Sequence, residues 1–500
     1  MAGKHSDQAT TRALTALGLR AQGGREAKVT GISVDSRDVR EGHLFAALPG
    51  TRLHGATFIQ YALRMGAGAV LTDRAGANIA KSELAGTGVA LVLAEDPRQA
   101  LAYAAALWFG AQPEIMVAVT GTNGKTSVAS FTRQIWEAMG IRAANLGTTG
   151  VEGAFRAQLS HTTPEPVTLH RLLADMAAAG VSHAAMEASS HGLAQSRLDG
   201  VRLSAAAFTN FTQDHLDYHQ NFDDYFNAKA GLFSRVLPEE GTAVINIDDA
   251  RGPEMAEIAR VRGQRLISVG RSETADIRIL NQRFDTTGQE VLFSWQGDQR
   301  RVRLALIGGF QAENVLAAAG LVIGTGVEAS DVFDTLHELT TVRGRMQLAA
   351  TREHGAPVFV DYAHTPDAVA TALSALRPHV LGRIIVVLGA GGDRDQGKRA
   401  LMGQAAEANA DVVFVTDDNP RSEDPAVIRA MVMQGCPQAN EVGDRAEAIL
   451  RGVDALGPGD ALLIAGKGHE TGQTVGDDVL PFDDAEQASV AVAALEGRLA

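Results

Sequence analysis

The chain contains almost no cysteine. Cys436 is the single cysteine among 500 residues, so no internal disulfide can form. A zinc site built from cysteines is excluded for the same reason. Long apolar stretches are also missing, since none approaches the roughly 18 residues that a membrane-spanning helix needs. Residues 1–20 lack the continuous apolar segment of a signal peptide, and we therefore expect a cytoplasmic protein without membrane insertion.

The chain also lacks an excess of basic residues. It has 45 lysines and arginines against 59 aspartates and glutamates, a formal net charge of −14. This field repels nucleic acid and anionic lipid, so we expect no nucleic-acid partner, and an anionic substrate would need local basic groups. We find no internal repeat and no low-complexity tract. The apolar and charged fractions, 45% and 21%, are those of an ordinary soluble protein.

Short apolar runs alternate with helical patterns along the whole chain, which predicts an α/β protein of about three domains. In the first domain (1–112) we expect strands at 43–48 and 90–96, a helix and a strand within 55–70, and a helix at 99–110. The second domain (113–344) opens with the apolar strand 115–120, and an antiparallel appendage is expected within 265–308. The third domain is 345–500.

Four apolar segments of the third domain end in polar residues. They are APVFVDYAH (356–364), RIIVVLGAGGDRD (383–395), DVVFVTDDNPR (411–421) and ALLIAGKGHE (461–470). Helical patterns separate them, which predicts a doubly wound, Rossmann-like parallel sheet. All four polar ends would then lie at its carboxyl edge, where ligands bind.

The segment VAVTGTNGKTS (117–127) has the order strand, glycine turn, helix start. Backbone N–H groups of such a turn hold phosphate oxygens, helped by the positive end of the helix dipole. Lys125 is predicted to reach the β- and γ-phosphates, and the Thr126 hydroxyl to bind Mg²⁺. The usual pattern is GxxxxGK[ST], but Val119 stands at its first glycine position, so this is a variant loop. The loop predicts nucleotide binding and leaves the reaction open.

The variant TGTNGKTS resembles the phosphate loop of the Mur ligase family, whose members form amide bonds with ATP during peptidoglycan assembly. VDSRDVREGHLFAALPGTRLHG (34–55) resembles the UDP-binding first domain of that family. Further matches follow in chain order: HTTPEP (161–166), EASSHGLAQSR (187–197), NFTQDHLDYH (210–219), FNAKAGLF (226–233), GGFQAENVLAA (308–318), VRGRM (342–346), DYAHTPDA (361–368), GAGGDRDQGKR (389–399), DNPR (418–421) and GKGHE (466–470).

The resemblance implies a central P-loop-type ATP domain with a mostly parallel sheet, a smaller N-terminal α/β UDP-binding domain and a C-terminal amino-acid domain. It also implies an ATP-dependent ligase of peptidoglycan precursor synthesis, with Mg²⁺ as cofactor. This ligase would add meso-diaminopimelate to UDP-MurNAc-L-Ala-D-Glu through an acyl phosphate, giving ADP and phosphate. We expect a monomer.

The family resemblance implies roles near the transferred phosphate. Gly121, Thr122, Asn123, Gly124, Lys125, Thr126 and Ser127 would hold the nucleotide phosphates. Thr126 would hold one Mg²⁺ beside the β- and γ-phosphates, and Glu187 and His215 would hold a second. Lys229, as a carbamate formed by its neutral amine and CO₂, would supply oxygens beside Mg²⁺. Restored activity of a Lys229→Ala variant by short carboxylates would support the carbamate, and wild-type activity of that variant would contradict it. Catalysis is assigned to Lys125, Glu187, His215 and Lys229.

The resemblance assigns further residues to ATP and to the UDP substrate. Asn314 would contact adenine, and Arg345 and Asp361 the phosphate and ribose regions; His364 is a weaker match. Val34, Ser36, Thr51, Arg52 and Leu53 would surround uridine. Thr162, Thr163, Ser189, Gln195 and Arg197 would bind the MurNAc-peptide. Two positions depart from the family pattern, because His161 and Gln311 stand where asparagine is common, and the role of His161 stays open.

Diaminopimelate differs from lysine by one carboxylate on the distal carbon. Arginine binds carboxylate through two parallel hydrogen bonds, and leaving it unpaired with lysine can discriminate by roughly 10⁴-fold. DNPR matches the diaminopimelate-type motif, so Arg421 is the expected carboxylate binder. The other residues assigned to this pocket are Arg394, Asp418, Asn419, Pro420, Gly466 and Glu470. Glu423 and Asp424 have no assigned role.

Two alternatives remain at this point. One is a lysine-adding or folylpolyglutamate synthase-like ligase, against which the complete first domain and DNPR argue. The other is a P-loop protein that uses ATP only to change conformation. Taken alone, DNPR is more typical of a turn with a surface ion pair, and Lys229 of a helix surface. The combination of motifs favours the ligase.

Overall fold

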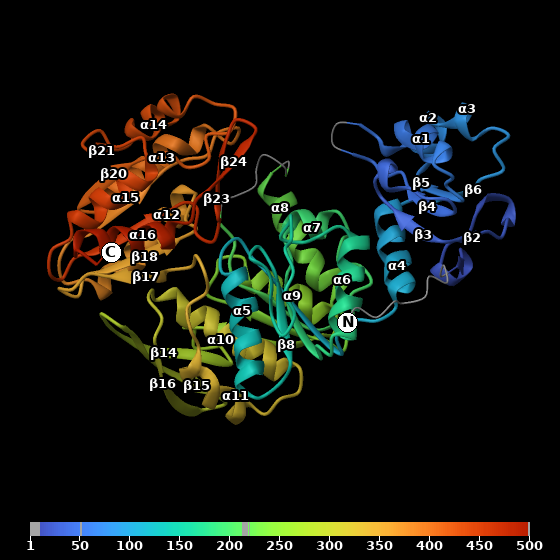
Figure 1. The fold of residues 1–500 in the computed structure, drawn as a ribbon. Coiled ribbons are helices and arrows are strands. Elements are labelled where there is room, and N and C mark those ends of the chain that lie inside the picture. The colour runs from blue at the N-terminus through green and yellow to red at the C-terminus, as the bar shows by residue number, and fades with distance from the viewer. Residues whose placement is uncertain (1–10, 51–52, 213–218, 220, 499–500) are drawn as a thin grey trace, which may run out of the picture. The chain divides into compact units, whose positions relative to one another are not determined.

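The computed structural model describes residues 11–50, 53–212, 219 and 221–498 (Figure 1). The chain divides into two compact units. The first unit comprises Met1–Ala118, Arg142–Ser204 and Asn227–Glu239, and the second comprises Val119–Ile141, Ala205–Phe226 and Glu240–Ala500. The predicted three-domain boundaries do not coincide with this division and stay a prediction.

The N-terminal part of the first unit is a four-stranded parallel sheet. Its order is β3 (Gly31–Ser33), β4 (His43–Ala46), β5 (Ala69–Thr72), β6 (Ala90–Leu93). Successive side chains of a strand point to opposite faces, so Leu44 joins one apolar cluster and Phe45 another. The helices are α1 (Ile59–Arg64), α2 (Arg74–Ile79), α3 (Lys81–Leu84) and α4 (Pro97–Phe109), and β1 (Arg12–Ala13) pairs with β2 (Lys28–Val29). The strands and helices expected here are confirmed, with bounds that differ by a few residues: β4 and β6 are shorter than expected, whereas α4 begins earlier and β5 ends later.

A ten-stranded sheet follows, in the order β16-β15-β14-β13-β12-β11-β7-β10-β8-β9. The strands are β7 (Ile115–Thr120), β8 (Ala143–Gly147), β9 (Gly150–Gly153), β10 (His183–Glu187), β11 (Leu203–Phe208), β12 (Thr242–Asn246), β13 (Arg265–Gly270), β14 (Ile277–Asp285), β15 (Gly288–Trp295) and β16 (Asp298–Leu304). The pairs from β11 to β14 are parallel, whereas β14, β15 and β16 are antiparallel. The antiparallel appendage expected within 265–308 is therefore confirmed.

Helices separate most of the parallel strands along the chain, as a parallel sheet requires. They are α5 (Lys125–Ala138), α6 (Pro166–Ala178), α7 (Ser190–Ala194), α8 (Phe222–Gly231) and α9 (Gly252–Val261). Two further helices, α10 (Phe310–Gly324) and α11 (Ala329–Thr335), follow β16. Within the second unit, α5 packs against α10. Helix α10 is apolar on nearly every side and almost completely buried, which fixes the start of α5 in the core.

The C-terminal part of the second unit is a six-stranded sheet, drawn in orange to red in Figure 1. Its order is β17 (Gln347–Thr351), β18 (Pro357–Asp361), β22 (Ala461–Ala465), β19 (Ile384–Leu388), β20 (Val412–Val415), β21 (Asn440–Glu441). Only the edge strand β17 is antiparallel among these described strands. The predicted doubly wound parallel sheet is confirmed.

Helices cover both faces of this C-terminal sheet. Val386 and Leu463 pack in one core with α12 (Pro366–Leu376), α13 (Gly397–Asn409) and α14 (Pro425–Met433). Ile385 and Leu462 point the other way, into a core with α15 (Arg445–Asp454) and α16 (Asp484–Leu495). A hairpin of β23 (Gly472–Val475) and β24 (Asp478–Pro481) follows β22. Because β18, β19, β20 and β22 run parallel, their polar ends meet at one edge.

Candidate active site

The glycine turn between β7 and α5 has the geometry of a phosphate-binding loop. Gly124 has a φ of +87° and precedes the first residue of α5, and Gly121 has a φ of +149°. Lys125 Nζ donates to the carbonyl oxygens of Gly121 at 2.9 Å and Thr122 at 2.8 Å. The lysine thus folds back over the turn, with its charge where an anion would sit. Thr126 and Ser127 are buried at the helix start.

Two side chains from the segment after β11 brace this loop. Thr209 Oγ1 donates to the carbonyl of Asn123 at 2.6 Å, and the N–H of Asn123 donates to Asn210 Oδ1 at 2.8 Å. Thr209 was not predicted from the sequence. Asn210 begins the matched segment NFTQDHLDYH, the signal by which this brace could have been found.

Asn314 lies against the same loop. A Cβ added at Gly124 would stand 2.6 Å from Asn314 Oδ1, so only glycine allows this approach. Asn314 Nδ2 donates to Gln311 Oε1 at 3.2 Å, and both side chains are buried in α10. Gln311, the residue that departs from the family pattern, therefore orients Asn314.

Arg345 and Asp361 meet the loop from the C-terminal part of the second unit. Arg345 Nη2 donates to Thr126 Oγ1 at 3.1 Å, and its guanidinium lies 4.6 Å from the centre of the Tyr362 ring. Asp361, at the end of β18, accepts the N–H of Met346 at 2.7 Å. Burial raises the pKa of Asp361, while the charge of Arg345 and two backbone N–H groups lower it. The structure thus places Thr126, Arg345 and Asp361 together.

In the first unit, Glu187 ends β10 and is almost completely buried. Its Oε1 accepts the N–H of Thr148 at 2.8 Å, and its Oε2 accepts the Thr148 hydroxyl at 3.1 Å. The Thr148 and Thr162 hydroxyls are 3.0 Å apart. Thr148 was missed from the sequence, because its link to Glu187 joins residues 39 apart in the chain.

The expected MurNAc-peptide residues gather around Thr163. The Thr163 hydroxyl donates to the Glu187 carbonyl at 2.9 Å and accepts the N–H of Ser189 at 3.1 Å. Arg197 donates to the Thr163 carbonyl at 2.6 Å and to Gln195 Oε1 at 2.8 Å. Thr162, Thr163, Glu187, Ser189, Gln195 and Arg197 therefore form one polar cluster, as expected.

The remaining residues of the expected metal and uridine sites are only partly described. Lys229 lies on α8 and is 1% exposed, which differs from the helix-surface position that the residue alone suggested. His215, Thr51 and Arg52 lie outside the described residues. Val34 and Leu53 are exposed, at 36% and 63%, and Ser36 begins a short 3₁₀ turn.

The described residues include no group of three His, Cys, Asp or Glu side chains that is placed to hold a metal ion. Among the described residues, each Glu187 carboxylate oxygen accepts one hydrogen bond, and a carboxylate oxygen can accept two. Carboxylate and hydroxyl oxygens are ligands that Mg²⁺ prefers, so the Glu187 carboxylate and the Thr126 hydroxyl each suit such an ion.

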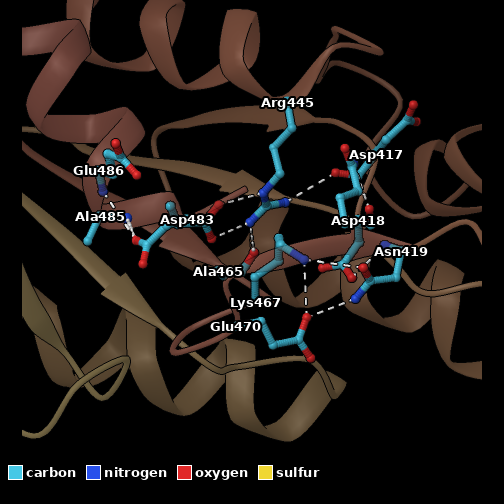
Figure 2. Close-up of polar contacts among 12 residues, drawn as sticks. Asp417, Asp418, Asn419, Arg445, Ala465, Lys467, Glu470, Asp483, Ala485 and Glu486 are labelled. Atoms are coloured by element: carbon cyan, nitrogen blue, oxygen red, sulfur yellow. Dashed lines mark hydrogen bonds and ion pairs between the residues drawn. The ribbon is translucent and has the colours of Figure 1, made fainter. Parts of the chain in front are cut away.

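The four residues of DNPR follow β20. Asp418 and Asn419 lie beside Lys467 and Glu470 of the GKGHE turn (Figure 2), and Asn419 also accepts the N–H of Thr474 in the β23–β24 hairpin. Asn419 Nδ2 donates to Glu470 Oε2 at 2.9 Å, and the Asn419 N–H donates to Asp418 Oδ1 at 2.7 Å. A Cβ at Gly466 would stand 2.5 Å from Asp418 Oδ2. Asp418, Asn419, Gly466 and Glu470 are thus brought together as expected. Lys467, which also joins this group, was not predicted.

Arg421 adopts a left-handed backbone conformation, with a φ of +52°. Its N–H donates to the Thr474 carbonyl at 3.1 Å, and its Nη1 donates to the Gly392 carbonyl at 2.8 Å. Pro420 is buried beside Gly392, where a Cβ would meet the Pro420 carbonyl. Arg394 is exposed on the loop after β19.

Glu423 and Asp424 have structural roles next to this pocket. Glu423 accepts one hydrogen bond from each terminal nitrogen of the buried Arg399, both at 2.8 Å. This guanidinium lowers the pKa of Glu423 to about 2. Asp424 accepts the N–H of Ala426 and caps α14. His364 contacts the Tyr362 ring, and exposed His161 bonds its neighbour Ser160.

No helix among the described residues is long and apolar enough to cross a membrane.

Three family models match successive parts of the chain. The description "Mur ligase family, catalytic domain" matches residues 28–108, "Mur ligase middle domain" 119–322, and "Mur ligase, glutamate ligase domain" 344–468. Similar proteins named UDP-N-acetylmuramoyl-L-alanyl-D-glutamate–2,6-diaminopimelate ligase occur in Bradyrhizobium diazoefficiens and Brucella melitensis. The former is 49% identical over 93% of this chain and 95% of its own. The latter is 50% identical over 94% of this chain and 95% of its own.

Solved structures are similar over nearly the whole chain. One, also titled as a UDP-N-acetylmuramoyl-L-alanyl-D-glutamate–2,6-diaminopimelate ligase, has a TM-score of 0.70 and 34% identity, and the match covers 97% of this chain and 100% of that one. A MurF ligase from Thermotoga maritima in complex with ADP has a TM-score of 0.60 over 97% of this chain and 99% of that one. At 18% identity, the latter shows a shared fold.

Proposed function

The chain belongs to the Mur ligase family, and from this premise we propose that it adds meso-diaminopimelate to UDP-MurNAc-L-Ala-D-Glu with ATP. The proposal rests on sequence identity: over 93–94% of the chain, 49% and 50% of the residues are identical to those of ligases named for this activity. An enzyme of this kind makes a peptidoglycan precursor. The cytoplasmic location and the monomeric state expected from the sequence stay predictions.

The reaction has two steps. The terminal carboxylate of the UDP-linked dipeptide attacks the γ-phosphate of ATP, and ADP leaves. The amine of the incoming amino acid then attacks the carbonyl carbon of the acyl phosphate, loses a proton and expels phosphate. Both steps concentrate negative charge, so the site needs fixed donors where that charge develops.

We assign the nucleotide to the loop of the second unit. Residues 121–127 supply backbone N–H groups, and Lys125 already lies over the turn. Arg345, bonded to Thr126, brings a second positive charge to the phosphates. Asn314 would contact adenine and Asp361 the ribose region. The contact of Asn314 with Gly124 and that of Asp361 with Met346 support these roles.

The polar cluster of the first unit fits the anionic, carbonyl-rich MurNAc-peptide. Thr162, Thr163, Ser189, Gln195 and Arg197 would bind this part of the substrate, and Val34, Ser36 and residues 51–53 its uridine. We propose that Thr126 holds one Mg²⁺ beside the nucleotide phosphates, that Glu187 and His215 hold a second, and that carbamylated Lys229 supplies oxygens beside Mg²⁺. When bound, these ions supply positive charge to the phosphate oxygens. The burial of Lys229 supports the carbamate, because burial favours the neutral amine that reacts with CO₂.

We assign the amino acid to the pocket after β20 and β22. Arg421, with Arg394, would bind the distal carboxylate of diaminopimelate. Asp418, Asn419 and Glu470 would accept hydrogen bonds from its distal ammonium. Pro420 would help to fix its loop, and Gly466 would allow close approach of the backbone. The contacts among Asp418, Asn419 and Glu470 support this assignment, since they place two carboxylates beside one amide.

Phosphate release tests the proposed reaction. We expect the purified chain to release phosphate from ATP when UDP-MurNAc-L-Ala-D-Glu and meso-diaminopimelate are both present, and to stop when either is omitted. Release with ATP alone, driven by neither substrate, would instead indicate a protein that uses ATP to change conformation. Release with a folate and glutamate would indicate a folylpolyglutamate synthase-like ligase.

A further inference from the structure

Lys467, the second residue of GKGHE, has a fully buried side chain in the proposed amino-acid pocket. Figure 2 shows it pointing toward Asn419 and Glu470. Its Nζ donates to Asn419 Oδ1 at 3.2 Å, Glu470 Oε2 at 3.1 Å and the Gly472 carbonyl at 2.5 Å. An ammonium has three N–H donors and no acceptor, so all three are engaged. A buried charge persists only when it is paired in this way.

The contacts of Lys467 set the orientation of the Asn419 amide. Asn419 Oδ1 accepts from Lys467 and from the N–H of Thr474 at 2.9 Å, while Nδ2 donates to Glu470. If the amide were turned over, its NH₂ group would face these two donors. Lys467 and Thr474 therefore fix the NH₂ group of Asn419 toward Glu470.

Glu470 is oriented by the same two residues. Its Oε2 accepts from Lys467 and from Asn419 Nδ2, at 3.1 and 2.9 Å. Among the described residues, none donates a hydrogen bond to Oε1, and the side chain is 32% exposed. Glu470 thus presents one held oxygen and one open oxygen. The open oxygen can accept an N–H from a ligand.

A second buried cation nearby has a different partner. Arg445 makes two 2.7 Å hydrogen bonds to Asp484, and both side chains are completely buried. This pair joins α15 to α16 and neutralises itself. Lys467, by contrast, pairs with a carboxylate that reaches the surface. The Arg445–Asp484 pair is therefore structural, whereas the Lys467–Glu470 pair faces the proposed amino-acid site.

We propose that Lys467 is a positioning residue for amino-acid recognition. It orients Asn419 and Glu470 so that Glu470 Oε1 accepts a hydrogen bond from an ammonium of the incoming amino acid. Lys467 itself does not touch that substrate, because its three donors are engaged within the protein. This inference rests on the proposed function.

The test is a Lys467→Met variant assayed for all three substrates. Hydrogen bonds to charged groups are strong enough that we expect the KM for meso-diaminopimelate to rise about 10- to 100-fold. The KM values for ATP and for UDP-MurNAc-L-Ala-D-Glu should stay within about twofold of the wild type. Arg352→Met is the matched control. It removes a mostly buried cation, paired with Glu496 at 3.3 Å, from the same compact unit but outside the pocket.

A double-mutant cycle separates positioning from general destabilisation. In a Glu470→Gln background, adding Lys467→Met should raise the KM for meso-diaminopimelate by no more than about twofold, because coupled residues are not additive. If Lys467→Met does not fold, Lys467→Gln keeps an amide donor and should show the same selective rise, to a smaller extent.

Three results would overturn the inference. One is an equal rise of all three KM values, as a structural role would give. Another is full additivity with Glu470→Gln. The third is a wild-type KM for meso-diaminopimelate in Lys467→Met. If the wild type itself makes no diaminopimelate product, the proposed function fails, independently of Lys467. If the wild type makes it and Lys467→Met keeps the wild-type KM, the inference about Lys467 alone fails.

Discussion

At the scale of single residues, Arg421 combines an unfavourable backbone with a proposed function. A φ of +52° costs a residue with a side chain roughly 1–3 kcal/mol, and such strain gathers at functional sites. The structure maintains it through the hairpin, because Thr474 accepts the Arg421 N–H and Gly476 donates to the Arg421 carbonyl. The strained backbone supports the proposal that the direction of this side chain matters.

Glu423, two residues later, should contribute to stability in a pH-dependent way. Arg399 lowers the pKa of Glu423 from 4.5 to about 2, so the ionised carboxylate stabilises the folded state. This contribution is fully present above about pH 4.5 and is lost as the pH falls toward 2. We expect the urea-unfolding midpoint of Glu423→Gln to lie below that of the wild type at neutral pH. The difference should shrink below about pH 4.5.

The control for this prediction is Glu447→Gln. Glu447 forms an exposed pair with Arg451 on α15, and such pairs contribute little. Its unfolding midpoint should follow that of the wild type across the pH range. A Glu423→Gln difference that stays constant from neutral pH to about pH 3 would contradict the assigned role of the Arg399 pair.

At the scale of elements, the phosphate loop depends on the space around Gly121. A Cβ at this position would stand 1.9 Å from Thr209 Oγ1, the hydroxyl that holds Asn123. We expect Gly121→Ala to displace the loop and to lower kcat/KM for ATP by roughly 10²-fold, the effect of a 1 Å misplacement. Steady-state kinetics with ATP varied measure this change.

Gly140→Ala is the matched control for Gly121→Ala. Gly140 also has a positive φ, +76°, but a Cβ there would meet nothing within 4 Å. The variant should lose about 1–2 kcal/mol of stability and keep the wild-type kcat/KM for ATP. Wild-type kinetics with ATP in Gly121→Ala would contradict the account of the loop.

The elements that the sequence could predict are those with local signals. An apolar run, a glycine turn and an amphipathic pattern locate β7, the loop and α5 within a few residues. The antiparallel strands β14 to β16 were likewise predicted. The β23–β24 hairpin was not, although it holds the Arg421 backbone.

Contacts between distant segments could not be predicted. Thr148 bonds Glu187 across 39 positions, and Lys467 bonds Asn419 across 48. Nothing in the neighbouring sequence marks these partners, because a hydrogen bond between loops depends on how strands pair in the sheet. Glu423 is a further case, since the sequence left it without a role and the structure pairs it with Arg399.

At the scale of the whole molecule, motifs and topology agree. Mostly parallel sheets place the ends of β7, β10, β18, β20 and β22 beside the residues that the family resemblance assigned. The sequence could predict this arrangement because each motif directly follows an apolar strand. The division of the chain into three domains stays a prediction. Strands of the ten-stranded sheet belong to both compact units.

The central claim is that this protein selects meso-diaminopimelate by its distal carboxylate. A site built around Arg421 would leave the guanidinium unpaired with L-lysine, which can discriminate by roughly 10⁴-fold. In Arg421→Ala this preference should fall to about tenfold or less, because the cation that distinguishes the two amino acids is gone.

The most direct test is competition between the two amino acids. The wild type receives equal concentrations of meso-diaminopimelate and L-lysine with ATP and UDP-MurNAc-L-Ala-D-Glu, and mass spectrometry identifies the UDP-linked product. We predict that the diaminopimelate product exceeds the lysine product by about 10³-fold or more. Comparable amounts of the two products would contradict the account.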